Sequence, residues 1–273
     1  MNTNSSLTTW LKQAQWALEK AGIATARLDA LVLLEDALHT NRAQLLAYPE
    51  LELSNEQEKV LKSQISRRAR HQPLAYIRKK SEFYGREFQV SPHTLVPRPE
   101  TETMIDLLKS LPLPAGATLA DVGTGSGCIA ITAALELPNL ANIDAYEIDE
   151  KAMQLAQINA QGLDARHIKF RLNNLLDKVA EQYDAVLANL PYVPENFQIN
   201  LAATHEPRHA IFGGPDGLNL YRKLFGQLRQ QQPKFVLTEA LPPQHPELAR
   251  IAKAAGFHLQ KTEDFIQLFV PKP

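Results

Sequence analysis

The chain has 273 residues, of which 44% are hydrophobic, so it is long enough to bury a substantial core in one large or two small domains. Its formal net charge of −1 argues against a protein that depends on a broad basic face to bind nucleic acid. The single cysteine, Cys128, excludes an internal disulfide framework, and no spacing of Cys and His resembles a metal site. The polar first nine residues lack the pattern of a signal peptide and no apolar run reaches membrane-spanning length, so we expect a cytoplasmic protein.

The first part of the chain, residues 1–78, has apolar residues at helical spacing and a single glycine, Gly22. One helix face is marked by Leu7, Leu11, Ala14 and Leu18, and a second by Leu28, Leu31, Val32, Leu34, Ala37 and Leu38. The stretch Ser54 to Gln57 is a capping box that opens a further helix. We therefore predict a small all-helical bundle with Trp10 and Trp16 in its core.

The pattern changes after residue 78. Phe83, Phe88 and Val90 lie among Gly85 and several prolines, which predicts a β-hairpin linker over residues 79–98. In residues 99–273, strand-like and helix-like segments alternate, which predicts an α/β domain with a mostly parallel sheet. The expected strands are 118–122, 143–146, 168–172, 184–188 and 235–237, the helices are 128–137, 149–160, one through Leu220 and Leu224, and 248–255, and the segments 257–259 and 265–270 form a terminal antiparallel hairpin.

Ligands of such folds lie at the carboxyl ends of the strands. After the first strand comes Gly123-Thr124-Gly125-Ser126-Gly127, whose glycines allow a sharp turn and a close approach to a ligand. The spacing is neither that of dinucleotide enzymes nor that of a Walker loop, so it favours an adenosyl ligand without a pyrophosphate. A glycine-rich turn without a ligand is the alternative.

Two further loops support this interpretation. Glu147 ends the next strand, 20 positions beyond Gly127, where a carboxylate can accept hydrogen bonds from both ribose hydroxyls. Asp149 is expected to cap the following helix instead. At the third strand end, Asn173-Asn174-Leu175 offers amide groups that can meet an adenine edge, although a polar turn explains the same residues equally well.

The tetrapeptide Asn189-Leu190-Pro191-Tyr192 closes the fourth strand. A side-chain amide, a backbone carbonyl beside a proline and an aromatic ring suit the binding of a planar NH2 group before methyl transfer to nitrogen. The turn chemistry of Asn and Pro also explains the tetrapeptide as a tight turn that leaves a sheet.

Taken together, these loops resemble those of class I S-adenosylmethionine-dependent methyltransferases. More narrowly, the chain from about residue 20 resembles the release factor glutamine methyltransferases, on the motifs Phe83-Tyr84-Gly85, Leu95 to Glu102, Asn189 to Tyr192, Glu206-Pro207-Arg208 and Gly213 to Leu218. The resemblance implies a helical bundle that docks the substrate, a hairpin linker and a seven-stranded Rossmann-like domain. It also implies a role in translation termination, in which the glutamine of the Gly-Gly-Gln motif of peptide chain release factors is methylated.

The same resemblance implies roles for single residues. Those that bind S-adenosylmethionine are Gly123, Thr124, Gly125, Ser126, Gly127, Glu147, Asn174, Leu175 and Asn189, and those that hold the glutamine are Asn189, Leu190, Pro191 and Tyr192. We expect the Asn189 side-chain oxygen and the Leu190 carbonyl to accept the two N–H groups of the substrate amide, with Tyr192 stacked on its plane.

The chain departs from the family at two positions. Leu190 stands where the family usually has proline, which predicts a less rigidly held acceptor. Asn174 stands where the family more often has aspartate, although an amide oxygen still accepts from an adenine amine. Because Asn-Leu-Pro-Tyr is typical of ribosomal RNA adenine dimethyltransferases, a nucleic-acid adenine methyltransferase is the alternative function. The net charge gives that alternative little support, since the basic cluster from Arg67 to Lys80 is small.

Overall fold

The computed structural model describes residues 6–272. The chain divides into two compact units. The first comprises the chain up to Lys79 together with Asn200–His205, and the second comprises Lys80–Ile199 with the chain from Glu206 onward. Within residues 6–272, no helix is both long enough and apolar enough to cross a membrane.

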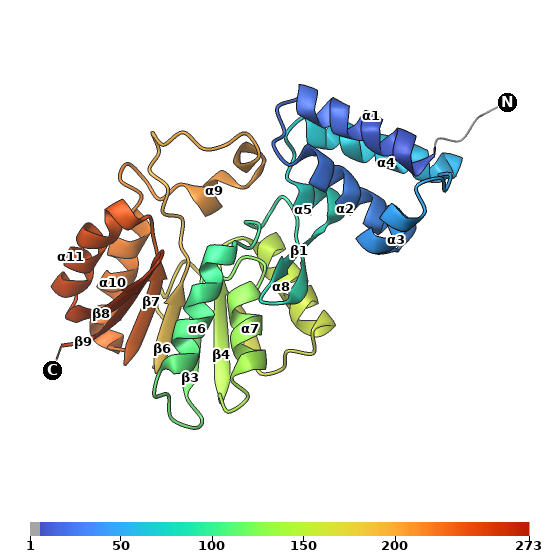
Figure 1. Cartoon of the computed structure of the whole chain (residues 1–273). Coiled ribbons are helices and arrows are strands. Elements are labelled where there is room, and N and C mark those ends of the chain that lie inside the picture. The colour runs from blue at the N-terminus through green and yellow to red at the C-terminus, as the bar shows by residue number, and fades with distance from the viewer. Residues whose placement is uncertain (1–5, 273) are drawn as a thin grey trace. The chain divides into compact units, whose positions relative to one another are not determined.

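The first unit is all helical, as the sequence predicts (Figure 1, blue to teal). Its helices are α1 (Leu7–Lys20), α2 (Ala26–Leu38), α3 (Arg42–Ala47), α4 (Asn55–Ala69) and α5 (Leu74–Arg78), and the second segment of the unit adds a short 3-10 helix, Ala203–His205. The capping box at the start of α4 is confirmed: Gln57 N donates to Ser54 Oγ, and Ser54 N donates to Gln57 Oε1. Leucines from α1, α2 and α4, among them Leu18, Leu33 and Leu61, are fully buried between the helices.

The expectation that both tryptophans lie in this core is half wrong. Trp10 is buried, whereas Trp16 is 63% exposed, and Lys20 Nζ lies 5.1 Å from the centroid of the Trp16 ring. Trp10 follows Leu7 by three positions and precedes Ala14 by four, which places it on the buried face of α1. Trp16 lies two positions from Ala14 and therefore on the opposite side of the helix.

The basic cluster from Arg67 to Lys80, which begins in the last turn of α4, forms ion pairs inside the unit. Arg68 Nε lies 2.6 Å from Asp29 Oδ2, and both side chains are largely buried. Arg78 forms a second ion pair, with Asp36. These arginines stabilise the bundle, because each pairs with an acid of α2.

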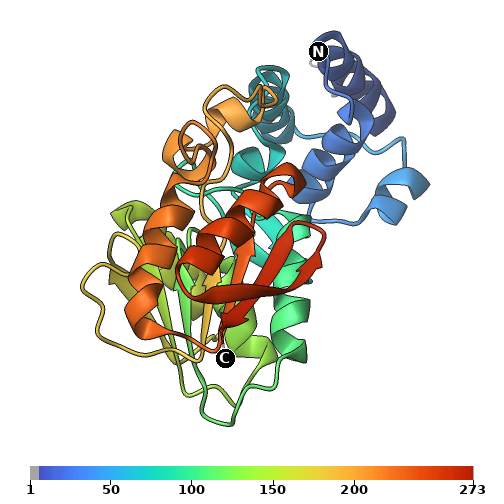
Figure 2. The same cartoon turned by 90° about the vertical axis from the view of Figure 1, so that its left-hand side faces the viewer.

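The second unit begins with the predicted hairpin, in which β1 (Lys80–Phe83) pairs antiparallel with β2 (Arg86–Gln89). Among the described residues a seven-stranded sheet follows, in the order β5-β4-β3-β6-β7-β9-β8. Its strands are β3 (Thr118–Val122), β4 (Asn142–Glu147), β5 (Ile168–Leu172), β6 (Ala185–Ala188), β7 (Phe235–Glu239), β8 (Phe257–Glu263) and β9 (Ile266–Pro271). The first five are parallel, and β9 pairs antiparallel with both β7 and β8 (Figure 2, red hairpin), which confirms the predicted α/β fold.

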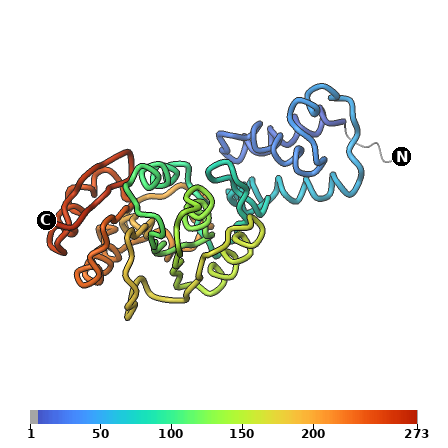
Figure 3. The backbone as a smooth tube through the Cα atoms, turned by 90° about the horizontal axis from the view of Figure 1, so that it is seen from below, coloured from blue at the N-terminus to red at the C-terminus, as the bar shows by residue number. Residues whose placement is uncertain are grey.

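Helices cover both faces of this sheet. Side chains of α6 (Glu102–Ser110), α7 (Cys128–Glu136) and α8 (Glu150–Gly162) pack with one face, and those of α10 (Asn219–Gln231) and α11 (His245–Ala254) pack with the other. The tube in Figure 3 separates the green turns of α6 from the orange turns of α10. Neither α6 nor the short elements Pro99–Thr101, α9 (Arg208–Ile211) and Pro242–Gln244 were expected from the sequence.

The order of the strands indicates where a ligand-binding site is expected. The chain runs from β3 outward through β4 to β5, then returns to add β6 on the other side of β3. The register sets Val122 beside Tyr146 and beside Ala188, so the loops that follow β3, β4 and β6 start side by side. Such a reversal of strand order opens a crevice at the carboxyl ends of the strands, where ligands of α/β folds bind.

Candidate active site

A pocket that is partly open to solvent lies at this crevice, and all its lining residues belong to the second unit. Most of the predicted site residues line it, namely Gly123, Thr124, Gly125, Ser126, Glu147, Asn174, Leu175, Asn189, Leu190 and Pro191. Two predicted residues, Gly127 and Tyr192, are not part of its lining. Asn173, expected with Asn174 near the adenine edge, lines it as well. Residues 93–98, Thr101, Tyr146, Ile148 and His209 line the pocket but were not predicted as site residues.

Two glycines of the loop, Gly125 and Gly127, have different roles. Gly125 has φ +56°, and a Cβ added there would meet no atom within 4 Å, so its backbone faces open space. A Cβ on Gly127 would lie 2.9 Å from Ile131 Cδ1 and 3.1 Å from the Ala156 Cβ. Gly127 therefore permits close packing of α7 on α8, whereas Gly125 leaves room for a ligand.

Glu147 ends β4 and is buried, with its carboxylate turned to the backbone around it. Its Oε2 accepts from Gly125 N at 2.9 Å, and its Oε1 accepts from Ile148 N and Asp149 N at 2.7 and 3.0 Å. Glu147 thus holds the glycine loop against the end of β4. Asp149 caps α8 as predicted, accepting from Lys151 N and Ala152 N.

Asp121 lies beneath the glycine loop and is completely buried. Its Oδ2 accepts from Thr124 Oγ1 at 2.6 Å and from Ala130 N at 3.1 Å, and no described group bonds to its Oδ1. Burial, with a smaller contribution from the nearby Glu147, raises the pKa of Asp121 to about 7. The Asp121 carboxyl group, which anchors the glycine loop, therefore takes up a proton more readily than an exposed carboxylate does.

The third loop is folded on itself by Asn173, whose side-chain Nδ2 donates to the carbonyls of Leu175 and Asp177. Leu175 has φ +55°, a conformation that is unusual for leucine. Asn174 is exposed and lines the pocket beside the buried Leu175. The pocket is thus lined by two amide residues, Asn173 and Asn174, and one apolar residue, Leu175, from this loop.

The tetrapeptide follows β6 directly. Asn189 Nδ2 donates to Thr101 Oγ1 at 3.0 Å. Leu190 is 2% exposed, and its backbone N–H donates to the buried Tyr221 hydroxyl at 3.2 Å. The prediction that leucine holds the acceptor less rigidly than proline stays a prediction; the structure shows that the Leu190 side chain is packed and its N–H is bonded.

Glu239, which ends β7, hydrogen-bonds to residues of this region and was not predicted from the sequence. It is completely buried, and its Oε2 accepts from Thr101 Oγ1 at 2.6 Å while its Oε1 accepts from the Tyr192 hydroxyl at 3.0 Å. Burial raises the pKa of Glu239, and hydrogen bonds from Thr101, Tyr192 and Asn189 act in the opposite direction. A glutamate at the end of a buried strand, as at Glu147, is the signal that would have identified it.

Residues 93–98 form another wall of the pocket. Val96 N donates to Glu206 Oε2 at 3.1 Å, and the Arg98 guanidinium lies 2.7 Å from Glu206 Oε1. The Glu206 side chain is 2% exposed. Glu206, from the distant Glu206-Pro207-Arg208 motif, therefore holds this segment in place. Its carboxylate is also the ion-pair partner of Arg98.

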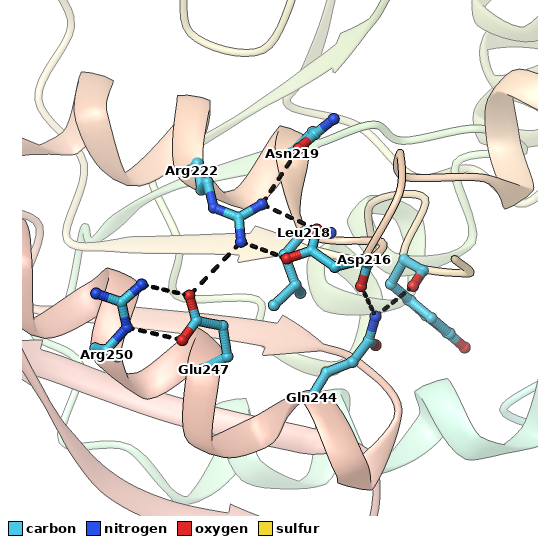
Figure 4. Close-up of polar contacts among 8 residues, drawn as sticks. Asp216, Leu218, Asn219, Arg222, Gln244, Glu247 and Arg250 are labelled. Atoms are coloured by element: carbon cyan, nitrogen blue, oxygen red, sulfur yellow. Dashed lines mark hydrogen bonds and ion pairs between the residues drawn. The ribbon is translucent and has the colours of Figure 1, made fainter. Parts of the chain in front are cut away.

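The Gly213 to Leu218 turn supports the tetrapeptide from behind. Gln244 Nε2 donates to the carbonyls of Tyr192 and Asp216, both at 2.7 Å (Figure 4). Asp216 in turn pairs with Arg222, which also contacts Glu247, and the guanidinium lowers the pKa of Asp216 to about 2. A Cβ on Gly213 would overlap the Pro191 carbonyl, so glycine is required for this close approach.

Comparisons with known proteins agree with this architecture. Residues 9–78 match the family described as PrmC N-terminal domain, and residues 101–207 match the family described as Methyltransferase small domain. A release factor glutamine methyltransferase of Coxiella burnetii (strain RSA 493 / Nine Mile phase I) is 39% identical over 197 residues, which cover 71% of each chain. Another, of Koribacter versatilis (strain Ellin345), is 40% identical over 217 residues, which cover 77% of each chain. The crystal structure of a methyltransferase from Pyrococcus furiosus aligns with a TM-score of 0.51 at 18% identity, over 80% of this chain and 98% of that one, which shows the shared fold.

Proposed function

The chain belongs to the family of release factor glutamine methyltransferases, and from this premise we propose that it methylates the side-chain amide nitrogen of the glutamine in the Gly-Gly-Gln motif of peptide chain release factors. The observation that supports this most is the meeting of two loops in one pocket. Gly125 offers open backbone suited to a nucleoside, and Asn189 offers a side-chain amide suited to another amide.

We propose S-adenosylmethionine as the cofactor. The space in front of Gly125 fits a ligand that approaches the backbone closely, and Asn174 and Leu175 would flank its adenine. An ionised carboxylate offers about four acceptor positions. Since Glu147 uses three for backbone N–H groups, a grip on both ribose hydroxyls requires that one of these bonds be exchanged. When bound, this cofactor supplies the electrophilic methyl group, and the protein contributes orientation and electrostatics.

The methyl acceptor is an amide nitrogen, which is a weak nucleophile because its lone pair is delocalised into the carbonyl. Orientation is therefore the main contribution of the protein. In the proposal, the Asn189 side-chain oxygen and the Leu190 carbonyl accept the two N–H groups of the substrate and stabilise positive charge that grows on the nitrogen. The surplus proton passes to water, since the tetrapeptide contains no basic side chain.

We further propose that the helical unit, of which residues 9–78 match the PrmC N-terminal domain, docks the release factor. The functional division is the bundle over residues 1–78, the linker over 79–98 and the methyltransferase domain over 99–273. A variant that lacks the bundle is expected to bind the cofactor but to methylate an intact release factor poorly. Equal methylation of an intact release factor by this variant would rule out docking through the bundle.

The decisive experiment incubates the protein with labelled S-adenosylmethionine and a cell extract and identifies the labelled residue by mass spectrometry. Label on the Gly-Gly-Gln glutamine of a release factor is expected. Label on RNA adenine would favour the alternative that Leu190 raises, and label on another protein would replace the release factor as substrate.

A further inference from the structure

Two hydroxyl groups at the tetrapeptide converge on one buried carboxylate. Thr101 Oγ1 donates to Glu239 Oε2 and the Tyr192 hydroxyl donates to Glu239 Oε1. The nearby Asn189 amide also acts to lower the pKa of Glu239. Thr101 and Glu239 are both almost completely buried. Thr101 is 138 positions from Glu239, so the fold alone brings this cluster together.

The direction of these bonds is fixed by chemistry. The single hydroxyl hydrogen of Thr101 is donated to Glu239 Oε2, so the Thr101 oxygen offers only lone pairs to Asn189. The group of Asn189 that faces Thr101 must therefore be the NH2, as the 3.0 Å contact from Nδ2 shows. The amide oxygen then lies on the side of the amide group that faces away from Thr101.

This polarity matters for the reaction. The oxygen and nitrogen of an amide exchange places by a rotation about one bond, which changes the shape of the side chain little. A rotated Asn189 would present two N–H donors to the NH2 of a substrate glutamine, which has no strong acceptor to offer. The carboxylate of Glu239 removes this alternative, because a rotated Asn189 would place two acceptors, its own oxygen and that of Thr101, against each other.

We propose that Thr101 and Glu239 are positioning residues that fix the Asn189 amide with its oxygen toward the glutamine nitrogen. The inference rests on the proposed function for its activity readout. In this proposal both residues act through Asn189 and not through a contact of their own with the substrate. The Glu239 carboxylate also accepts a hydrogen bond from the Tyr192 hydroxyl, and this second bond holds the aromatic ring of the tetrapeptide in place.

The test is a double-mutant cycle of Thr101→Val with Asn189→Ala. Thr101→Val keeps the side-chain shape but removes the hydroxyl, and we expect kcat on a release factor to fall by roughly tenfold while the Kd of the cofactor stays within about twofold. In the Asn189→Ala background the same substitution is expected to have no further effect on kcat, because the group through which it acts is gone. Thr101→Ser, which restores the hydroxyl, is expected to recover most of the lost kcat. Independent losses that multiply in the double variant would overturn the inference.

A matched control lies next to Glu239. Thr238 is completely buried in β7, and its hydroxyl has no hydrogen-bond partner among the described residues. Thr238→Val therefore makes the same chemical change in the core beside the cluster and is expected to leave kcat unaltered. A loss of kcat equal to that of Thr101→Val would mean that the site responds to core packing and not to amide orientation, which contradicts the inference.

A second readout does not depend on methylation. In the wild-type protein the side-chain NH2 of Asn189 is expected to give two distinct, exchange-protected NMR signals, and Thr101→Val is expected to abolish this protection. Unchanged protection in a folded Thr101→Val protein would overturn the inference even if no substrate were methylated. Absence of glutamine methylation by the wild-type protein would instead count against the proposed function alone.

Discussion

The backbone N–H of Leu190 donates to the hydroxyl of Tyr221, a buried residue of α10 that also bonds to the carbonyls of Ala188 and Glu239. One hydroxyl thus ties the end of β6 to the end of β7, at the place where a proline at position 190 would have no hydrogen to give.

Tyr221→Phe is expected to reduce the free energy of unfolding by about 1–3 kcal/mol, the range for a buried donor that loses its partner. Leu190→Pro removes the donor itself, so the loss should be smaller, about 1 kcal/mol. In the Leu190→Pro background, Tyr221→Phe should cost less than in the wild type. Urea denaturation of the four proteins checks this, and strictly additive losses would show that the bond contributes nothing.

Gly213→Ala is expected to impair the tetrapeptide through a steric clash, because the added methyl group overlaps the carbonyls of Pro191 and Gly217. We expect lower stability together with a lower kcat. Gly226→Ala is the control, since its added methyl group meets nothing within 4 Å in the interior of α10. That substitution should raise stability by about 0.5–1 kcal/mol. If both variants behave alike in thermal unfolding and methylation assays, the close approach of Gly213 has no functional consequence.

Glu147→Ala is expected to weaken S-adenosylmethionine binding by on the order of 1.5–3 kcal/mol, the range for hydrogen bonds to a charged group. The same change releases the Gly125 N–H and so loosens the glycine loop. Asp149→Ala serves as the control, because it removes the cap of α8, a loss of about 1 kcal/mol in stability, and should preserve cofactor affinity. Calorimetric titration that finds unchanged affinity for Glu147→Ala would refute this assignment.

The pH dependence of stability should report on Asp121. Its pKa is raised from 3.8 to about 7 in the folded protein, so the neutral carboxyl is the favoured form there. Its contribution to stability is therefore fully present below about pH 4 and is lost as the pH rises through about 7, by roughly 4 kcal/mol in total. Asp121→Asn cannot titrate, so wild type should lose stability relative to this variant between about pH 4 and about pH 8. A difference between the two proteins that is constant with pH would contradict the raised pKa.

Most of the parallel sheet could be predicted because β3, β4, β6 and β7 are largely buried runs that end in or are followed by a glycine, a carboxylate or an amide. The pocket was less predictable, since Thr101 lines it and Glu206 and Glu239 hold its lining residues from segments far apart in the chain. Helix α6 went unpredicted although its buried residues Met104, Ile105, Leu107 and Leu108 recur at helical spacing. Trp16 was misplaced because burial was judged from residue type instead of its position on the helix.

The central claim is that Asn189 holds the substrate amide in the transition state. Asn189→Ala should lower kcat on a release factor by roughly 10²-fold or more, the scale seen when a preorganised contact to developing charge is removed. The exposed Asn139, which lies outside the pocket, gives a control in Asn139→Ala, whose kcat should match that of the wild type. The direct measurement is single-turnover methylation of a release factor, with the product identified by mass spectrometry. A 10²-fold slower formation of methylglutamine by Asn189→Ala is predicted, and a normal rate, with or without a raised KM, would contradict the account.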